Sequence, residues 1–497
     1  MKKTIVLSLS LLFGLSAFAQ NNCKVEDELP IKLMSAEMKR GFKTFQKQNP
    51  PLYYLSYQYY TNDLSDIKVS EGSVAREYYG RSRASVTVFP RVGSPALDNT
   101  RRLTVMSSVS DRLTNEDMPA AEGDGKAFST ALWRATDAAV KKAQGDLDGV
   151  KAEKLTAPTR FDDSPDFAYP PVERFCRTAE FATFDYDKIK AMLVKASTLT
   201  KGKKFILASN FSFEREVGYR YFVDSRGTQL KTPHQEVRLS YVVSGKTENG
   251  QEVSRFNDYN VLRPEELPSE EKLLADTRKS IEELEQLVNA PEGDPFEAPT
   301  LLKGRAMAVF VHEILGHRME GHRQKMEDFG RTFTDKIGQQ VVSPILTIID
   351  DATLSYFNGE VMRGFYEYDD EGVKSRPVTL VEKGVLKNFL MSSSPIKNFP
   401  ASNGHGRGNH YFRPVARMAV TRALAEQTVT YDELEKKFLQ EIKRQNKPYG
   451  FMIEDLSGGF TMTDTYSPQA FKLEPTLMYR VYPVSYTHLT LPTILLV

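Results

Sequence analysis

The stretch His312-Glu313-Ile314-Leu315-Gly316-His317 follows an apolar run at residues 307–311 that can bury one face of a helix. Imidazole nitrogens are common ligands of zinc, and a carboxylate beside the first imidazole can take a proton from water activated by the metal. The sequence therefore predicts a hydrolytic zinc site. In this site His312 and His317 bind Zn2+, and Glu313 is the general base.

The spacing of the two histidines is unusual for a metal-binding helix. The familiar metalloprotease pattern separates its histidines by four residues, which places both rings on one helix face. Here the separation is five, so on a regular helix the two rings would point about 140° apart. Gly316, directly before the second histidine, is a position where a helix can end, kink or widen into a π turn. We therefore expect a local distortion that brings both rings onto one ion.

Further polar residues follow the motif. Glu320 and His322 lie within the next turn, and each is a candidate either for a further metal ligand or for a hydrogen-bond partner of a ligand. The simpler alternative is a solvated helix end that carries histidines by chance, since the chain has seven histidines. The clustering of these residues favours the metal site.

The motif and the sequence after it resemble the TldD/PmbA metalloproteases. Metal-bearing members of that family carry His-Glu-x-x-Gly-His followed by a Glu-Gly step, which corresponds here to residues 312–317 with Glu320 and Gly321. Similar stretches follow in the same order at residues 349–351, 369–372, 402–417 and 450–459. The resemblance extends over residues 30–483 and is strongest after residue 300.

The resemblance implies a zinc peptidase that hydrolyses peptides or unfolded polypeptides. It also implies assembly, either as a homodimer or as a heterodimer with a family member that lacks the metal motif. In such proteins the motif histidines bind zinc, the adjacent glutamate is the base, and a cysteine near the carboxyl end is the third ligand. This chain departs from that pattern, because its two cysteines, Cys23 and Cys176, both precede the motif.

The last fourteen residues, 484–497, differ from the charged sequence that precedes them. They resemble translated adapter sequence at the end of an assembled gene, so we expect the native coding sequence to continue past residue 483 and to differ from this tail. A genuine apolar tail is the alternative. The identity of the third zinc ligand is therefore open. It could come from the missing carboxyl end, from Glu320 or His322, or from a distant residue that folding brings close.

Composition limits the classes of partner. The chain has 66 basic and 65 acidic residues and a formal charge of +1, so it lacks the basic field that binds phosphate backbones. Nucleic acid is therefore not an expected partner, although some members of the family that it resembles carry an old label as modulators of DNA gyrase. A length of 497 residues with 40% hydrophobic content predicts two or three globular domains.

The first nineteen residues predict a targeting segment. Lys2 and Lys3 precede an apolar run at residues 5–15, and Ala17-Phe18-Ala19 forms a small-residue cleavage site. We expect export to the periplasm or the extracellular space, where a disulfide between Cys23 and Cys176 is permitted, although spacing alone leaves the pairing open. No later stretch reaches about twenty uncharged apolar residues, so no membrane span is expected.

The periodicity of apolar residues predicts an α+β fold. Its N-terminal α/β region has an antiparallel sheet, and its C-terminal domain is mostly antiparallel β and carries the motif helix. The expected divisions are a signal peptide (1–19), an N-terminal α+β domain (20–200), a strand meander with a long helix (201–298), a metallopeptidase domain (299–483) and a non-native tail (484–497).

Individual elements follow from the same patterns. Helices are expected at 34–48, around 128–139, from 269 to before Pro291, and from Thr430 to before Pro448. Strands are expected at 53–60, 205–213, 217–223, 237–243, 345–349, 378–381, 385–390 and 415–420. Glu282, Glu283 and Glu285 are assigned to a solvated helix face, and Leu434, Phe438 and Ile442 to a buried one.

Two further segments are candidates for the substrate cleft. Residues 403–410 contain three glycines, which let backbone amides approach a ligand, and the resemblance places this loop beside the cleft. His405, Arg407, Arg413 and Arg417 are then candidates for substrate binding, with the arginines holding a peptide carbonyl or carboxylate. A flexible surface loop is the alternative. Residues 369–372, Asp-Asp-Glu-Gly, either border the cleft or form a solvated turn, and no metal is assigned to them.

A different class of function competes with the peptidase. A non-catalytic partner or scaffold subunit of a peptidase complex could use zinc only to fix the helix. Glu313 argues against this alternative, because structural zinc sites take four protein ligands and need no neighbouring base.

Overall fold

The computed structural model describes residues 21–101, 114–156, 162–291, 296–326, 331–409, 412–462, 470–483, 487–490 and 495–496. The expected targeting segment at residues 1–19 lies outside these ranges, as do His410 and much of the tail after residue 483.

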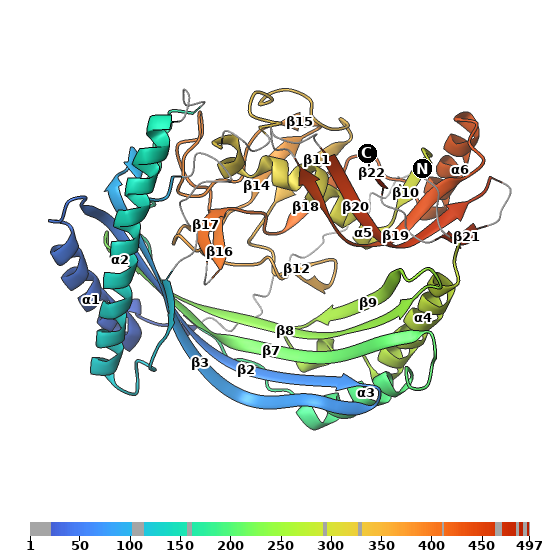
Figure 1. The fold of residues 1–497 in the computed structure, drawn as a ribbon, viewed down its shortest axis with the longest axis horizontal. Coiled ribbons are helices and arrows are strands. Elements are labelled where there is room, and N and C mark those ends of the chain that lie inside the picture. Colours follow the sequence, from blue (N-terminus) through green and yellow to red (C-terminus); the bar gives the residue numbers. More distant parts are fainter. Residues whose placement is uncertain are drawn as a thin grey trace, which may run out of the picture.

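The first half of the described chain is built on one large sheet (Figure 1). Four long antiparallel neighbours form its centre: β8 (Gln229–Lys246), β7 (Ile206–Asp224), β2 (Leu52–Ser70) and β3 (Ser73–Ser94). Shorter strands extend it, namely β1 (Asn21–Asn22), β4 (Leu97–Asp98), β5 (Thr114–Asp117), β6 (Arg174–Thr178) and β9 (Glu252–Asn260). The expected α+β class with an antiparallel sheet is confirmed.

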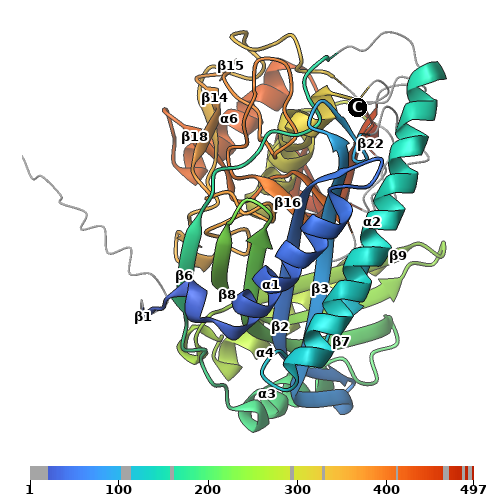
Figure 2. The same ribbon diagram turned by 90° about the vertical axis from the view of Figure 1, so that its left-hand side faces the viewer.

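Helices cover one face of this sheet. Near one end lie α1 (Leu29–Phe45) and α2 (Gly125–Thr156), and near the other lie α3 (Tyr186–Thr198) and α4 (Glu270–Val288), with short 3-10 turns at Val25–Asp27 and Pro264–Glu266 (Figures 1 and 2). Tyr57 and Tyr59 of β2 are fully buried under α1 and α2. These tyrosines therefore pack in the core of the sheet, as β-strand alternation requires.

The opposite face of the same strand is turned toward the C-terminal part. Gln58 lies between the two core tyrosines in sequence, and its side-chain amide donates to the backbone carbonyl of Asp370 at 2.6 Å. Figure 1 shows the C-terminal elements on the concave side of the curved sheet. The large sheet is thus a platform between the helices and the metal-motif region.

The large sheet crosses the expected boundary at residue 200. β7 pairs with β2 over fourteen consecutive residues, from Val69↔Phe211 to Ser56↔Asp224. The strands expected at 205–213 and 217–223 are also a single strand. Arg215, which lies between the two expected strands, forms an ion pair with Asp63 of β2 at 2.9 Å.

The C-terminal part is mostly antiparallel, as expected. One sheet contains β10 (Thr300–Leu302), β19 (Gly450–Met462), β20 (Ala470–Val481), β21 (Thr487–Thr490) and β22 (Leu495–Leu496), and only β10 pairs in parallel. A second contains β15 (Val385–Leu386), β14 (Val378–Glu382), β11 (Leu346–Asp350) and β18 (Thr421–Ala425). The C-terminal part also contains two separate two-stranded ribbons. One pairs β12 (Tyr356–Phe357) with β13 (Glu360–Val361), and the other pairs β16 (Gly406–Asn409) with β17 (Phe412–Ala416).

Two helices accompany these sheets, α5 (Gly304–Val311) and α6 (Tyr431–Arg444). A capping box at Thr430 starts α6, where the helix was expected to begin, but Leu434 is 39% exposed rather than buried.

In α4, Glu283 is buried and pairs with Arg255 at 2.8 Å, so the expected solvated face is wrong at this position. Of the strand expected at 415–420, only residues 415–416 form a strand, at the end of β17, and β18 starts after it at Thr421.

Among the described residues, no helix combines the length and the apolar character that crossing a membrane requires.

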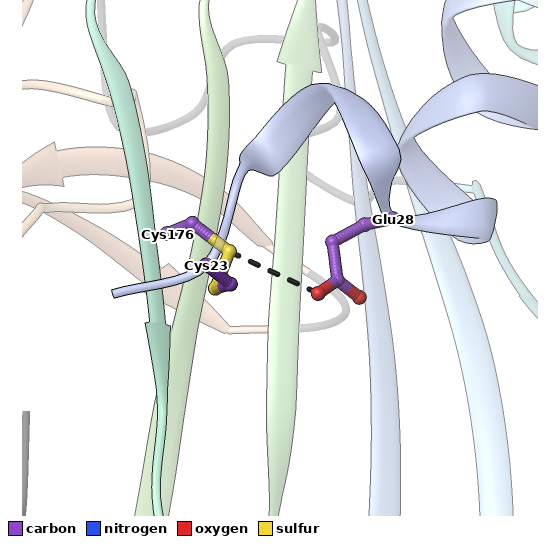
Figure 3. A group of neighbouring side chains, drawn as sticks. All are labelled: Cys23, Glu28 and Cys176. Carbon is purple, nitrogen blue, oxygen red and sulfur yellow. Dashed lines mark hydrogen bonds between the residues drawn. A yellow bond between two sulfur atoms is a disulfide. The ribbon is translucent and has the colours of Figure 1, made fainter. Parts of the chain in front are cut away.

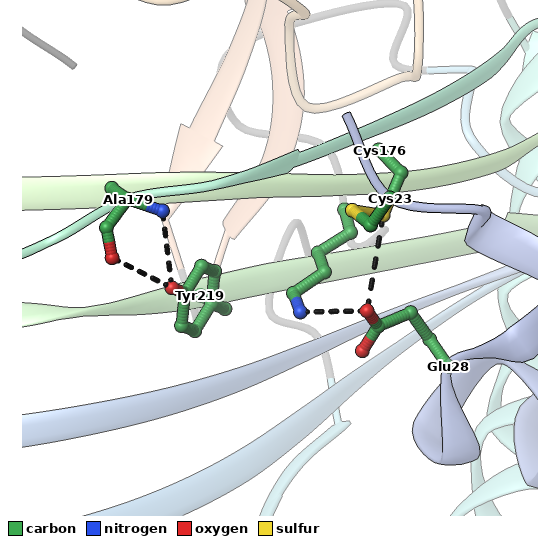
Figure 4. Close-up of a disulfide and its surroundings, with 6 residues drawn as sticks. Cys23, Glu28, Cys176, Ala179 and Tyr219 are labelled. Carbon is green, nitrogen blue, oxygen red and sulfur yellow. Dashed lines mark hydrogen bonds and ion pairs between the residues drawn. A yellow bond between two sulfur atoms is a disulfide. The ribbon is translucent and has the colours of Figure 1, made fainter. Parts of the chain in front are cut away.

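A disulfide joins Cys23 and Cys176, which settles the pairing that the sequence left open (Figure 3). It connects the segment before α1 to β6, across 153 residues of sequence, with Cα atoms 5.3 Å apart. Glu28 lies beside it and forms an ion pair with Lys231 of β8 at 2.8 Å (Figure 4). The disulfide and this ion pair thus both attach the N-terminal segment to the sheet.

We predict that replacing Cys176 by serine lowers the free energy of unfolding by about 2–5 kcal/mol, because the unfolded chain loses a long-range cross-link. Urea unfolding without reductant measures the change. The Cys23→Ser variant is the matched control and should show the same loss, with none added in the double variant. Equal stability of the parent and both single variants would contradict the prediction.

Candidate metal centre

The metal motif lies at the end of α5. The helix passes without interruption into a π turn, His312–Gly316, and then into a 3-10 turn, His317–Met319. A π turn holds more residues per turn than an α-helix, so it compensates for the additional residue between the histidines. The imidazole rings of His312 and His317 consequently face each other, with centroids 4.7 Å apart. The expected distortion is confirmed.

Contacts from distant segments surround the π turn. Gly316 has an ordinary helical φ of −54°, which any residue can adopt. A glycine is needed here because no room is left for a side chain. A Cβ at this position would overlap the sulfur of Met418, which lies in the loop after β17. On the other side, the hydroxyl of Thr461 in β19 donates to the backbone carbonyl of Glu313 at 2.6 Å. The distorted turn is thus held by two separate parts of the C-terminal fold.

The three motif side chains form one compact group of donors. Oxygens of Glu313 lie 3.9 Å from Nε2 of His312 and 3.8 Å from Nε2 of His317, and the potential ligand atoms of all three lie within 4.8 Å of one another. Nitrogens that bind one tetrahedral zinc ion at about 2.0–2.1 Å are separated by a little more than 3 Å. Small side-chain rotations therefore suffice, and the donor set fits zinc.

Protonation also suits metal binding. Burial, and next the neighbouring His317, lower the pKa of His312, which favours the neutral imidazole that a metal requires. Glu313 is only 7% exposed and is shielded from bulk water. Within the described part of the chain, no other His, Cys, Asp or Glu belongs to this donor group.

Glu320 lies behind His317 and is fully buried. Its carboxylate lies 3.1 Å from Nδ1 of His317 and accepts hydrogen bonds from Arg323 at 2.6 Å and from Arg417 at 3.3 Å. Burial alone raises the pKa of a carboxyl group, but the hydrogen bond from His317 and the nearby basic groups outweigh it and hold the pKa of Glu320 at about 2. The carboxylate is therefore ionised and acts only as an acceptor.

His322, the other nearby candidate, does not join the donor group. Burial lowers its pKa to about 4, so its ring is neutral. The ring lines a cavity of about 130 Å³ between the large sheet and the C-terminal part, together with Tyr54, Phe167 and Arg413.

The residues predicted to bind substrate are dispersed, and only Arg417 adjoins the metal centre. His405 is fully buried, with Nε2 3.2 Å from the Asp350 carboxylate, so it offers no surface to a substrate. Arg413 donates to the carbonyl of Asn99 and to Asp146 of α2 at 2.9 and 3.0 Å, which joins β17 to the N-terminal part.

Arg407 lies on the strand β16 and therefore not on a flexible surface loop. Its guanidinium stacks on Tyr366 at 4.2 Å and approaches Asp370 at 3.4 Å. It lines a cleft of about 390 Å³ between the concave face of the sheet and residues 361–370.

The acidic residues 369–371 are not a solvated turn, and their structural role was missed. Asp369 is fully buried, and burial together with the adjacent Glu371 raises its pKa to about 8. Asp370 forms a buried ion pair with Arg220 of β7 at 2.7 Å. These acids therefore attach the C-terminal part to the sheet. A partial signal was present, because consecutive acids before a glycine are also compatible with a buried, hydrogen-bonded loop.

Comparison with known proteins places the motif in a family. Residues 295–474 match the PmbA/TldA metallopeptidase C-terminal domain. This region of the chain belongs to the PmbA/TldD family. The matched residues include the π turn, the ribbon of β16 and β17, and the whole of β19.

Several curated relatives of this chain are metalloproteases. A metalloprotease of Methanocaldococcus jannaschii is 36% identical over 122 residues, which are 24% of this chain and 26% of that protein. A TldD homologue of Haemophilus influenzae is 36% identical over 138 residues, 27% of each chain. A zinc metalloprotease TldD homologue of Saccharolobus solfataricus is 29% identical over 94 residues, 19% of each. The aligned regions thus span less than a third of the length of these relatives.

Solved structures show the same fold over almost the whole chain. TldE from Thermococcus kodakarensis superposes with a TM-score of 0.57 at 14% identity, covering 94% of this chain and 90% of TldE. A proposed modulator of DNA gyrase from Bacteroides thetaiotaomicron superposes with a TM-score of 0.59 at 12% identity, with the same coverage. At these identities the likeness concerns the fold alone.

We predict that Gly316→Ala destabilises the protein by about 1–3 kcal/mol and weakens zinc binding, because the added methyl group overlaps Met418 and displaces the π turn. Urea unfolding and zinc titration measure the two effects. In the matched control, Gly145→Ala in α2, the new methyl group meets no atom within 4 Å, so this variant should be neutral or slightly more stable. An unchanged Gly316→Ala protein would show that the close packing is unimportant.

Proposed function

We propose that this protein is a zinc-dependent peptidase that hydrolyses peptides or unfolded polypeptides. The observation that carries the proposal is the pair of facing imidazoles with the carboxylate of Glu313 close to both. The metalloprotease names of the relatives support the reaction class, and the name of the Saccharolobus solfataricus protein supports zinc.

The motif residues would divide the chemistry among them. His312 and His317 would hold the zinc ion, which would activate a water molecule for attack on a peptide carbonyl. Glu313 lies within 4 Å of both rings and would accept the proton of that water. The same carboxyl group would then protonate the leaving amine.

Arg417 is the best-placed candidate to contact substrate. Its side chain is 45% exposed while one guanidinium nitrogen donates to Glu320, so its remaining N–H groups can bind a peptide carbonyl or carboxylate. Arg407 and Arg413 are farther candidates that line the two cavities beside the sheet.

One observation favours the alternative of a non-catalytic, zinc-stabilised partner or scaffold subunit. A catalytic zinc ion takes three protein ligands, and among the described residues only two imidazoles accompany Glu313 in the donor group. Zinc bound without any peptide turnover would favour this alternative.

We predict that Glu313→Gln lowers turnover of an unfolded polypeptide by about 10²–10⁴-fold while zinc content stays unchanged, because the amide cannot accept a proton. Cleavage of a peptide panel and metal analysis of the same samples measure this. Glu382→Gln, at an exposed position of β14, is the matched control and should behave as the parent. Unchanged turnover in Glu313→Gln would end the assignment of Glu313 as the base.

We also propose that the protein is exported to the periplasm or the extracellular space and works as a homodimer or with a family member that lacks the motif. The disulfide supports an oxidising compartment, and the structural likeness to TldE supports association within the family.

Native mass spectrometry of protein recovered from the periplasmic and extracellular fractions tests both points. We expect a particle of two subunits, in which this chain begins at Gln20 and carries one disulfide. A cytoplasmic, monomeric chain that retains Met1 would contradict both proposals.

A further inference from the structure

We propose that Glu320 is a positioning residue, which fixes His317 in the tautomer and orientation that bind metal, and that it is not itself a metal ligand. This inference rests on the proposed zinc site. It decides between two roles that the sequence left open for Glu320.

Both oxygens of the Glu320 carboxylate already have donors. Oε1 accepts from Nδ1 of His317 and from Arg417, and Oε2 accepts from Nε of Arg323. The carboxyl group is fully buried, so a rotation toward a metal would break several charge-assisted bonds in a site that water does not reach.

The hydrogen bond from His317 selects its tautomer. Nδ1 of His317 lies 3.1 Å from Oε1 of Glu320 and 3.4 Å from a guanidinium nitrogen of Arg323. The shorter contact, to a carboxylate that already pairs with two arginines, assigns the ring proton to Nδ1, which donates to Glu320. Nε2 then has a free lone pair, and this atom lies on the side of Glu313, 3.8 Å from its carboxylate. Glu320 therefore holds one nitrogen of the ring and leaves the other ready for the metal.

The backbone around Glu320 is also fixed. The amide of Gly321 donates to the carbonyl of Leu390, and the amide of Leu390 donates to the carbonyl of Met319, both at 2.9 Å. Gly321 permits this approach, since a Cβ there would press on Leu390 and Met391. The side chain of Glu320 thus extends toward the ring of His317 from a fixed backbone position.

Two arginines contact the buried Glu320 carboxylate and balance its charge. Arg323 comes from the 3-10 turn Gly321–Gln324, and Arg417 comes from the segment after β17. A buried charge without such partners is strongly unfavourable. Arg417 also adjoins Met418, the residue packed on Gly316, so one segment supports both the π turn and the carboxylate that orients His317.

The test compares Glu320→Gln with the parent protein in zinc titrations and in the absorption spectrum of the cobalt-substituted form. A positioning role predicts a 10–100-fold loss of metal affinity, with an unchanged cobalt spectrum at saturation, because the ligands around the ion are the same. Glu360→Gln, at an exposed position of β13, is the matched control and should retain the parent affinity. An altered spectrum would make Glu320 a ligand and overturn the proposal, as would an unchanged affinity.

A measurement on the parent protein avoids any effect of the substitution on folding. Nitrogen-15 NMR of the metal-free protein, labelled at histidine, should show His317 protonated at Nδ1. Protonation at Nε2 would overturn the proposal. Neither experiment measures turnover, so its failure is distinguishable from failure of the peptidase proposal, which depends on Glu313.

Discussion

A single π turn brings the two imidazoles together, and the rest of the centre depends on it. Five residues separate His312 from His317, and on a regular helix this spacing would direct the rings to different sides. The turn is not stabilised by its own sequence alone. Met418 fills the space beside Gly316, and Thr461 of β19 bonds the carbonyl of Glu313. The site therefore exists only when the β-rich C-terminal part has folded around α5.

The N-terminal sheet contributes by fixing the C-terminal part in place. Polar contacts join them, among them those of Arg220 with Asp370, Gln58 with the Asp370 carbonyl, and Arg413 with Asp146. Buried ion pairs of this kind add little net stability, because desolvation opposes the attraction between the charges. Their directional geometry nevertheless sets one orientation. We infer that these contacts set the orientation of the cavities beside the sheet relative to the metal motif. Apolar packing of α1 to α4 stabilises the large sheet itself.

Local patterns in the sequence predicted much of this structure. Tyr57 and Tyr59 alternate as core residues of a strand, Phe128 and Leu132 repeat as buried residues of α2, and Thr430 caps α6. The distortion at Gly316 was also predictable, because five-residue spacing and zinc coordination are incompatible on a regular helix. The disulfide was permitted by the sequence but not determined by it, since spacing does not report spatial distance.

Long-range contacts explain what the sequence did not predict. Residues 205–213 and 217–223 were expected as separate strands, but Arg215 between them pairs with Asp63 of β2 and lies within the continuous strand β7. Asp369 and His405 belong to types that are usually solvated or functional, yet both are buried by partners far away in sequence. The role of Glu320 was ambiguous for the same reason, because Arg417 reaches it from 97 residues away.

The most direct test of the central claim is a crystal of the zinc-loaded protein measured on both sides of the zinc absorption edge. The account predicts one anomalous peak between the two imidazoles, within about 2.1 Å of a nitrogen of each. A protein that takes up zinc but places it elsewhere, or crystals whose motif helix is regular with the rings directed apart, would contradict it.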